Sequence, residues 1–334
     1  MNTINFARFK KKTLKFLIRL LPQQYRTDIF FSVSNTKLRE TFKALNLESI
    51  IDVNTLSNHI LSVNCIIKLN ETTLASCSND KNIILWKITF KTLESLQVLK
   101  GHNEYVLNLT KLEEFLFASC GWDRLIKIWN YKSGECIQTH EYKNWDVFCM
   151  IKLRRQLVAI SDYDKIKIWD FKTGKEVKTL SGHVSGVTYM AKLNENLFAS
   201  ACKDKLNFWK IDSGVCTFTL HEKYDYYVCF VMLKENQIAK SDYLSIKIIN
   251  FKTNERIKVL NGHIAYIICI LKINENLIAS GSKDYNIKIW NIDEGECLKT
   301  LNGHACWVNC LTKLNERQLI SGSKDSKMKI WDLF

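Results

Sequence analysis

The sequence predicts an all-β fold built from seven copies of one unit, and two features of the chain indicate it. First, the segment SGSKDSKMKIWD near the end recurs in recognisable form six more times upstream. The anchors of the seven copies are Trp86, Trp129, Trp169, Trp209, Ile249, Trp290 and Trp331. Second, successive anchors are separated by 43, 40, 40, 40, 41 and 41 residues. A period in the low forties, with a His upstream and a Trp at its end, is typical of propeller blades, each a four-stranded antiparallel sheet.

From about Ile50 to Phe334 the repeats resemble those of the WD-repeat family. The resemblance implies a seven-bladed propeller braced by tetrads, each a hydrogen-bonded set of one His, one Ser or Thr, one Asp and one Trp. Five blades carry a full set: His59, Ser76, Asp80, Trp86; His102, Ser119, Asp123, Trp129; His183, Ser200, Asp204, Trp209; His263, Ser280, Asp284, Trp290; and His304, Ser321, Asp325, Trp331.

Two blades depart from this pattern. The third keeps His140, Asp164 and Trp169 but has Ile160 where the hydroxyl is expected. The fifth keeps only His221, and the other three places hold Lys240, Leu244 and Ile249. We therefore expect the fifth blade to lack its brace and to be the least stable of the ring.

Composition agrees with one continuous ring. The chain has 334 residues, is 46% hydrophobic and contains a single Pro.

Several of the twelve cysteines recur at the same place in different repeats. Cys65, Cys269 and Cys310 share one place, and Cys136, Cys216 and Cys297 share another. Such cysteines belong to different blades and there is no C-x-x-C pair, so we expect small buried side chains, no metal site, no cofactor and a reducing compartment.

Residues 1–49 do not fit the repeat and are predicted to form a separate extension before the propeller of residues 50–334. The extension carries a net charge of +7, half of the chain's +14. Apolar residues such as Phe9 and Leu17 fall on one side of a helical projection, and basic residues such as Lys12 and Arg19 fall on the other. The pattern predicts a basic amphipathic helix that ends near Pro22.

Four interpretations of this helix stay open. Residues 4–21 can pack on the propeller or on a partner helix, lie on an anionic membrane surface, or serve as a mitochondrial presequence. Leu21, Pro22 and the segment Ile29–Phe31 also faintly resemble the start of an F-box, which joins some WD-repeat proteins to a ubiquitin-ligase adaptor. A secretory signal is not expected, because Lys15 and Arg19 interrupt the apolar run. We expect a cytoplasmic protein, with the nucleus as the alternative.

The ends of the chain are expected to meet in one blade. The chain stops two residues after Asp332, so the last repeat lacks a fourth strand. Residues 53–56 stand in the matching place before His59, and pairing them there closes the ring without an open sheet edge. Between the third and fourth strands, Gly134, Gly174, Gly214, Gly295 and Asn254 are predicted to adopt left-handed turn conformations.

The recurring His, Ser and Asp also raise the possibility of a hydrolase triad. An enzyme needs one nucleophile, whereas this set occurs in at least five blades. A buried brace explains the repetition, because each polar group then satisfies another. We therefore expect a protein that is not an enzyme.

Binding is the expected function, through the face where the His and Asp loops open. The residues assigned to it are aromatic or basic: Tyr105, Trp122, Phe148, Tyr163, Lys203, Tyr226, Tyr266, Lys283, Trp307 and Lys324. This composition favours an interaction scaffold or adaptor that binds acidic peptides or proteins, as a monomer. A substrate-recognition subunit of a ubiquitin ligase is the alternative function. Nucleic acid is a less favoured partner, because the basic excess outside the extension is only +7.

Overall fold

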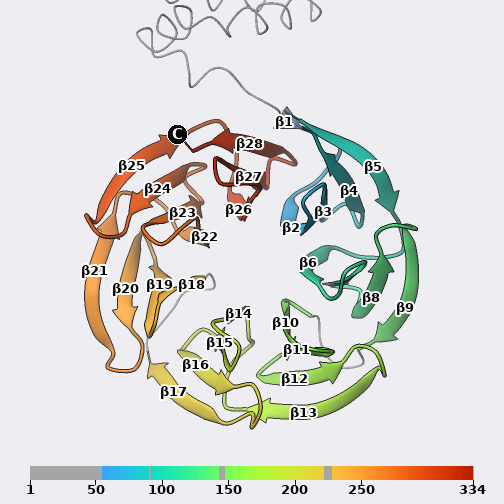
Figure 1. Cartoon of the computed structure of the whole chain (residues 1–334), viewed down its shortest axis with the longest axis horizontal. Coiled ribbons are helices and arrows are strands. Elements are labelled where there is room, and N and C mark those ends of the chain that lie inside the picture. Colours follow the sequence, from blue (N-terminus) through green and yellow to red (C-terminus); the bar gives the residue numbers. More distant parts are fainter. Residues whose placement is uncertain (1–54, 90–91, 143–146, 222–227, 334) are drawn as a thin grey trace, which may run out of the picture. The chain divides into compact units, whose positions relative to one another are not determined.

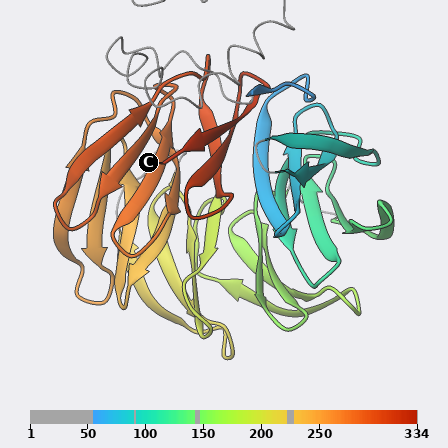
Figure 2. The same ribbon diagram turned by 45° about the horizontal axis from the view of Figure 1, so that its top comes forward.

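The computed structural model describes residues 55–89, 92–142, 147–221 and 228–333, which form seven four-stranded antiparallel sheets set around one axis (Figure 1). The tilted view of Figure 2 shows the sheets as separate twisted blades. The predicted seven-bladed all-β propeller is thus confirmed. Among the described residues there is no helix of the length and apolar character that a membrane span requires. The predicted extension of residues 1–49 lies outside the described part of the chain.

The blades follow the order of the repeats. Blade 1 contains β2 (Val63–Asn70), β3 (Thr73–Ser78), β4 (Ile83–Ile88) and β5 (Leu93–Leu99). Blade 2 contains β6 (Val106–Lys111), β7 (Leu116–Gly121), β8 (Leu125–Asn130) and β9 (Glu135–Glu141). Blade 3 contains β10 (Met150–Arg154), β11 (Leu157–Asp162), β12 (Lys165–Asp170) and β13 (Lys175–Ser181). Blade 4 contains β14 (Tyr189–Lys192), β15 (Leu197–Ala201), β16 (Lys205–Lys210) and β17 (Cys216–His221).

Blade 5 contains β18 (Phe230–Lys234), β19 (Gln237–Asp242), β20 (Ser245–Asn250) and β21 (Glu255–Asn261). Blade 6 contains β22 (Ile267–Lys272), β23 (Leu277–Ser282), β24 (Ile287–Asn291) and β25 (Glu296–Leu301). Blade 7 contains β26 (Val308–Lys313), β27 (Gln318–Ser323), β28 (Met328–Asp332) and, from the start of the chain, β1 (Thr55–Leu56).

Burial changes from the axis to the rim of each blade. In Figure 1 the first strand of each blade lies nearest the axis and the fourth at the rim. The second strand is buried on both faces, as the fully buried β3 illustrates, and therefore reads as a nearly continuous small or apolar run. The rim strands are largely exposed, and β9 has no fully buried residue. Because of this gradient, the last strand of each repeat contains fewer buried apolar residues than the second strand.

The core of the ring lies between successive blades. The anchor residue of each repeat packs against the blade before it: Trp129, for example, joins Ala75 and Leu85 of blade 1 in one buried cluster. Trp86 likewise packs with Ile320 and Met328 of blade 7. Because these contacts continue around the ring, each blade depends on its neighbours for burial.

The predicted closure of the ring is confirmed. Strand β1 pairs antiparallel with β28, with Thr55 opposite Lys329 and Leu56 opposite Met328. The first and last strands of the propeller therefore share blade 7, and the outer edge of β28 is covered.

The predicted turns are also confirmed. Gly134, Gly174, Gly214 and Gly295 have φ between 69° and 80°, and Asn254 has φ 57°. At the same end of the blades, lysines on the first strands reach across to the neighbouring blade. Lys152 Nζ donates to the Leu112 carbonyl at 2.9 Å, and Lys313 Nζ donates to the Ile273 carbonyl at 3.0 Å. These bonds add a polar link between blades to the apolar one.

Candidate functional site

Four complete tetrads lie in blades 1, 2, 6 and 7. In each, the His Nδ1 lies 2.6–2.8 Å from the Asp Oδ2 and the His Nε2 lies 2.6–2.8 Å from the Ser Oγ. The Trp Nε1 donates to the same Ser Oγ at 2.7–2.8 Å. The Asp also accepts the backbone N–H of the residue after the His at 2.9–3.1 Å. Every tetrad thereby fixes the loop before the first strand to the loop after the second strand.

The charge state of the tetrad follows from these bonds. Burial alone would raise the pKa of Asp325, but hydrogen bonds from His304 and from two backbone N–H groups lower it to about 2. The pKa values of Asp80, Asp123 and Asp284 are lowered by the same kind of bonds. An ionised carboxylate is therefore held at the base of each loop, where it accepts hydrogen bonds and organises the backbone.

The tetrad predicted for blade 4 is incomplete. His183 Nε2 lies 2.6 Å from Ser200 Oγ, and Trp209 Nε1 donates to the same oxygen at 2.8 Å. Asp204 does not reach the ring, however, and His183 Nδ1 is buried without a hydrogen-bond partner. The Ser and Trp are nine residues apart here and ten apart in the complete tetrads. The shorter connection between β15 and β16 therefore displaces the Asp from its usual place.

The assignment of His140 to a tetrad in blade 3 is wrong. His140 lies within β9 and pairs with Ile126, in the register that Leu180 has opposite Ile166. It thus occupies the place of a core leucine, and its ring meets the edge of Trp169 at 4.6 Å between centroids. His140 stands 24 residues before Asp164, whereas the His and Asp of the complete tetrads are 21 residues apart, and no hydrogen bond joins the two. Burial lowers the pKa of His140.

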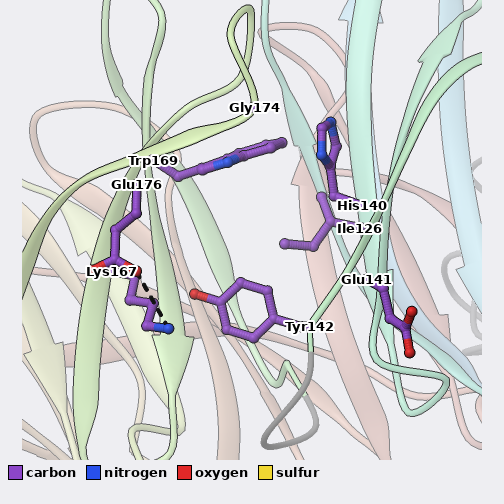
Figure 3. Close-up of a pocket in the computed structure, with 8 residues that line it drawn as sticks. All are labelled: Ile126, His140, Glu141, Tyr142, Lys167, Trp169, Gly174 and Glu176. Atoms are coloured by element: carbon purple, nitrogen blue, oxygen red, sulfur yellow. Dashed lines mark ion pairs between the residues drawn. The ribbon is translucent and has the colours of Figure 1, made fainter.

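A cavity of about 220 Å³ lies between β8 and β9 of blade 2 and β12 and β13 of blade 3. Figure 3 shows its walls, with Trp169 and His140 on one side and Tyr142 and Lys167 on the other. Lys167 Nζ is already paired with Asp162 at 3.2 Å and with Glu176 at 3.4 Å. Burial, with Asp162 and Glu176 nearby, raises the pKa of Tyr142, so its phenol stays neutral.

The assignment of His221 in blade 5 is wrong for a related reason. His221 is exposed at the end of β17 and pairs with Lys205, as Ser181 pairs with Lys165. Lys240, which stands in the place of the tetrad Ser, is fully buried. Blade 5 therefore contains no tetrad, as the sequence indicated.

Blades 3 and 5 share another brace, which the sequence analysis missed. The hydroxyls of Ser161 and Ser241 accept the backbone N–H groups of Cys149 and Cys229 at 3.1 and 3.0 Å. The next residue, Asp162 or Asp242, pairs with a lysine on the adjacent strand at 3.2 or 2.8 Å. The tripeptide Ser-Asp-Tyr in both blades is the sequence signal that could have identified this arrangement.

The loops held by these braces carry most of the predicted binding residues. Backbone N–H groups of Trp122, Lys283 and Lys324 donate to the carbonyls of Tyr105, Tyr266 and Trp307, respectively, at 2.8–2.9 Å. The two loops of one blade therefore lie side by side, and the repeat places them on the same face of the ring in every blade. We call this surface the Asp-loop face.

Two groups of these residues are in contact. In blade 2, Tyr105 stacks on Trp122 at 4.9 Å between centroids. In blades 5–7 a continuous series, which we call the Trp307 cluster, joins Tyr243, Tyr266, Lys283, Trp307 and Lys324. Its centre is the Trp307 ring, with Lys283 Nζ at 4.2 Å and Lys324 Nζ at 3.9 Å from its centroid.

The other predicted binding residues are not joined to either group by a described contact. Phe148 and Tyr163 are exposed at 40% and 43%, and Lys203 is exposed. Tyr226 lies outside the described residues. The sequence analysis missed the residues that follow the His of three repeats, Ile60, Val184 and Ile264, which are 67–83% exposed. Their place in the repeat, directly after the His, is the signal that could have found them.

Comparison with known proteins agrees with the propeller fold. The family model "WD domain, G-beta repeat" matches residues 51–87, 93–130, 254–291 and 295–332. The crystal structure of the WD40 β-propeller domain of Doa1 superposes with a TM-score of 0.73 at 18% identity, covering 84% of this chain and 96% of that one. A comparison with curated proteins finds no match. The matched segments contain all four complete tetrads, those of blades 1, 2, 6 and 7.

Proposed function

Because this chain belongs to the WD-repeat family, we propose that it is a protein-interaction scaffold that binds an acidic peptide or protein segment on its Asp-loop face. WD40 propellers generally act as non-catalytic interaction domains, which favours binding over catalysis. The main observation in favour of an acidic partner is the Trp307 cluster, in which two ammonium groups lie close to one indole ring.

The cluster provides the chemistry that an acidic segment needs. Lys283 and Lys324 lie over the Trp307 ring, which attracts both ammonium groups. Two positive charges are thereby placed beside an aromatic surface. Carboxylates of a partner can pair with the ammonium groups while its apolar side chains pack on the rings.

The surroundings of the cluster extend the surface. Tyr243 and Leu244 are about half exposed, at 45% and 46%, and Ile264 is 83% exposed. Exposed apolar side chains gathered beside charged groups are typical of interaction sites on soluble proteins. On the other side of the ring, Trp122 is 45% exposed and offers a second aromatic contact. An extended peptide that crosses the face is the partner that fits both groups.

Peptide binding tests this proposal directly. Fluorescence anisotropy would compare labelled peptides of equal length and apolar content that carry acidic, neutral or basic residues. We expect the acidic set to bind best, and the double substitution Lys283→Glu plus Lys324→Glu to reverse the preference. Phe218→Ala, on the exposed rim strand β17, is the matched control and should leave binding unchanged.

Affinity capture with the whole chain locates the site. Trp122→Ala combined with Trp307→Ala should lose the partners that the wild-type protein captures, whereas Phe218→Ala should keep them. Equal capture by all three proteins, or equal binding of acidic and basic peptides, would contradict the proposal. A steep loss of nucleic-acid affinity with salt, together with no peptide binding, would indicate a nucleic-acid partner.

A further inference from the structure

Five blades place a cysteine at one position of the strand nearest the axis. In blades 1, 6 and 7 the register shows it directly, because Cys65, Cys269 and Cys310 each precede the residue that pairs with the tetrad Ser. Cys149 and Cys229 hold the same position in blades 3 and 5, one residue before Met150 and Phe230. The remaining two blades have Asn108 and Tyr189 there.

The residue opposite this cysteine on the second strand differs between blades. It is Gly281 in blade 6 and Gly322 in blade 7. In blades 3 and 5 it is a Ser whose hydroxyl accepts a hydrogen bond from the cysteine's own backbone N–H. In blade 1 it is Cys77, which pairs directly with Cys65. Of the five cysteine positions, only blade 1 thus sets two thiols against each other on neighbouring strands.

The geometry of this pair suits a disulfide. Residues directly opposite on antiparallel strands have Cα atoms about 4.5 or 5.5 Å apart, which lies within the range of about 4.4–6.8 Å that a disulfide spans. The inner-strand thiol also points at its opposite residue. In blades 6 and 7 a Cβ added to the glycine would lie 2.7 Å from the Sγ of Cys269 or Cys310. Blade 1 has that Cβ, and on it a second sulfur.

The two thiols differ in access and acidity. Cys65 is partly exposed, whereas Cys77 is fully buried. A hydrogen bond with the Cys77 thiol lowers the pKa of Cys65, and burial raises the pKa of Cys77. A thiol with a lowered pKa beside a buried partner thiol is the arrangement of an attacking and a resolving cysteine.

We propose that Cys65 and Cys77 form a reversible disulfide when the protein meets a peroxide. The Cys65 thiolate attacks one oxygen of hydrogen peroxide, the O–O bond breaks, and Cys65 becomes a sulfenic acid as hydroxide leaves. The Cys77 sulfur then attacks the Cys65 sulfur, the S–O bond breaks, and the departing hydroxide takes the Cys77 proton as water. Two thiols lose two electrons to one peroxide, and a dithiol reductant reverses the reaction.

Peptide mapping of the oxidised full-length protein tests the proposal. Trypsin cuts after Lys68, so Cys65 and Cys77 fall in separate peptides, 44–68 and 69–81, each with a single cysteine. After treatment with hydrogen peroxide we expect these peptides to be joined, with a mass about 2 Da below their sum. Treatment with dithiothreitol should separate them again.

Substitutions separate the pair from the other cysteines. Cys65→Ser and Cys77→Ser should each abolish the joined peptide, and Cys77→Ser should leave peptide 44–68 as a sulfenic or sulfinic acid. Cys310→Ser is the matched control, since Gly322 stands opposite it, and should leave the bond intact. Serine is native at the place of Cys77 in blades 3 and 5, so this variant is expected to fold, which a thermal melt checks.

Other outcomes would overturn the proposal. If the wild-type protein stops at oxidised Cys65 with Cys77 still a free thiol, then Cys77 is not a resolving cysteine. If Cys65 instead becomes linked to any other cysteine, or if bonds between molecules through the exposed Cys136 or Cys297 form first, the blade 1 pair is not the preferred disulfide.

Discussion

The substitution Ser280→Ala measures what a tetrad contributes to the stability of the ring. Ser280 Oγ accepts the Trp290 indole N–H at 2.8 Å and lies 2.7 Å from His263 Nε2. Ser280 is fully buried, and Trp290 and His263 are exposed by only 1% and 4%. Water therefore cannot replace the hydroxyl once it is removed.

The expected cost follows from these contacts. A buried donor or acceptor that is left without its hydrogen-bond partner costs about 1–3 kcal/mol. Trp290 and His263 both lose their partner in this blade, so we expect a decrease of roughly 2–6 kcal/mol in the free energy of unfolding. Adding Trp290→Phe removes one of the orphaned donors, so the double variant should cost less than the sum of the single changes.

Urea unfolding followed by far-UV circular dichroism is the measurement. The midpoint should fall clearly in Ser280→Ala and stay at the wild-type value in Ser133→Ala, which changes an exposed turn serine outside the tetrads. A loss below about 0.5 kcal/mol, the range of ordinary surface substitutions, would refute the view that the tetrads brace the loops.

Three further predictions concern pH, ring closure and local stability. Burial and the neighbouring Lys205 lower the pKa of His183 from 6.5 to about 4. The unfolded chain therefore binds a proton in this window while the folded chain does not, so stability should fall as the pH decreases from about 6.5 to 4. In His183→Gln the urea midpoint should depend less on pH between about 6.5 and 4. If its dependence on pH is unchanged, other titratable groups cause the loss of stability. A chain that begins at residue 58 lacks β1 and should melt below one that begins at residue 47; equal melting temperatures by circular dichroism would contradict the observed closure. Amides of β19 and β20 should exchange with deuterium faster than those of β27 and β28, because blade 5 lacks a tetrad; equal protection would show that its Ser241 and Asp242 contacts replace the tetrad fully.

The repeat itself was predictable because it depends on local sequence. The anchors, their spacing and the turn residues Gly134 and Asn254 identified the blades, the hairpins and the strand that closes the ring. The blades and hairpins are decided within one repeat, where spacing along the chain translates directly into position, and the closing strand follows from the place that it matches in the other repeats.

The errors arose where position depends on strand register. His140 and His221 are histidines at about the expected distance from their anchors, yet both lie at the end of a rim strand rather than in the following loop. Asp204 has the same separation from its His as in the complete tetrads, but a connection shortened by one residue removes it from His183. Residue type and approximate spacing cannot distinguish these cases, because a shift of one or two residues changes the face on which a side chain lies.

The sequence by itself determined that seven sheets of one kind follow one another and that the first strand completes the last sheet, since repeated patterns of apolar and turn residues specify both. Only the tertiary structure decided which side chains of different repeats meet. Lys283 of blade 6 reaches Trp307 of blade 7, and Tyr243 of blade 5 meets Tyr266 of blade 6. The physical reason is that such contacts are set by the pairing of strands and the packing of neighbouring blades, which no single repeat contains.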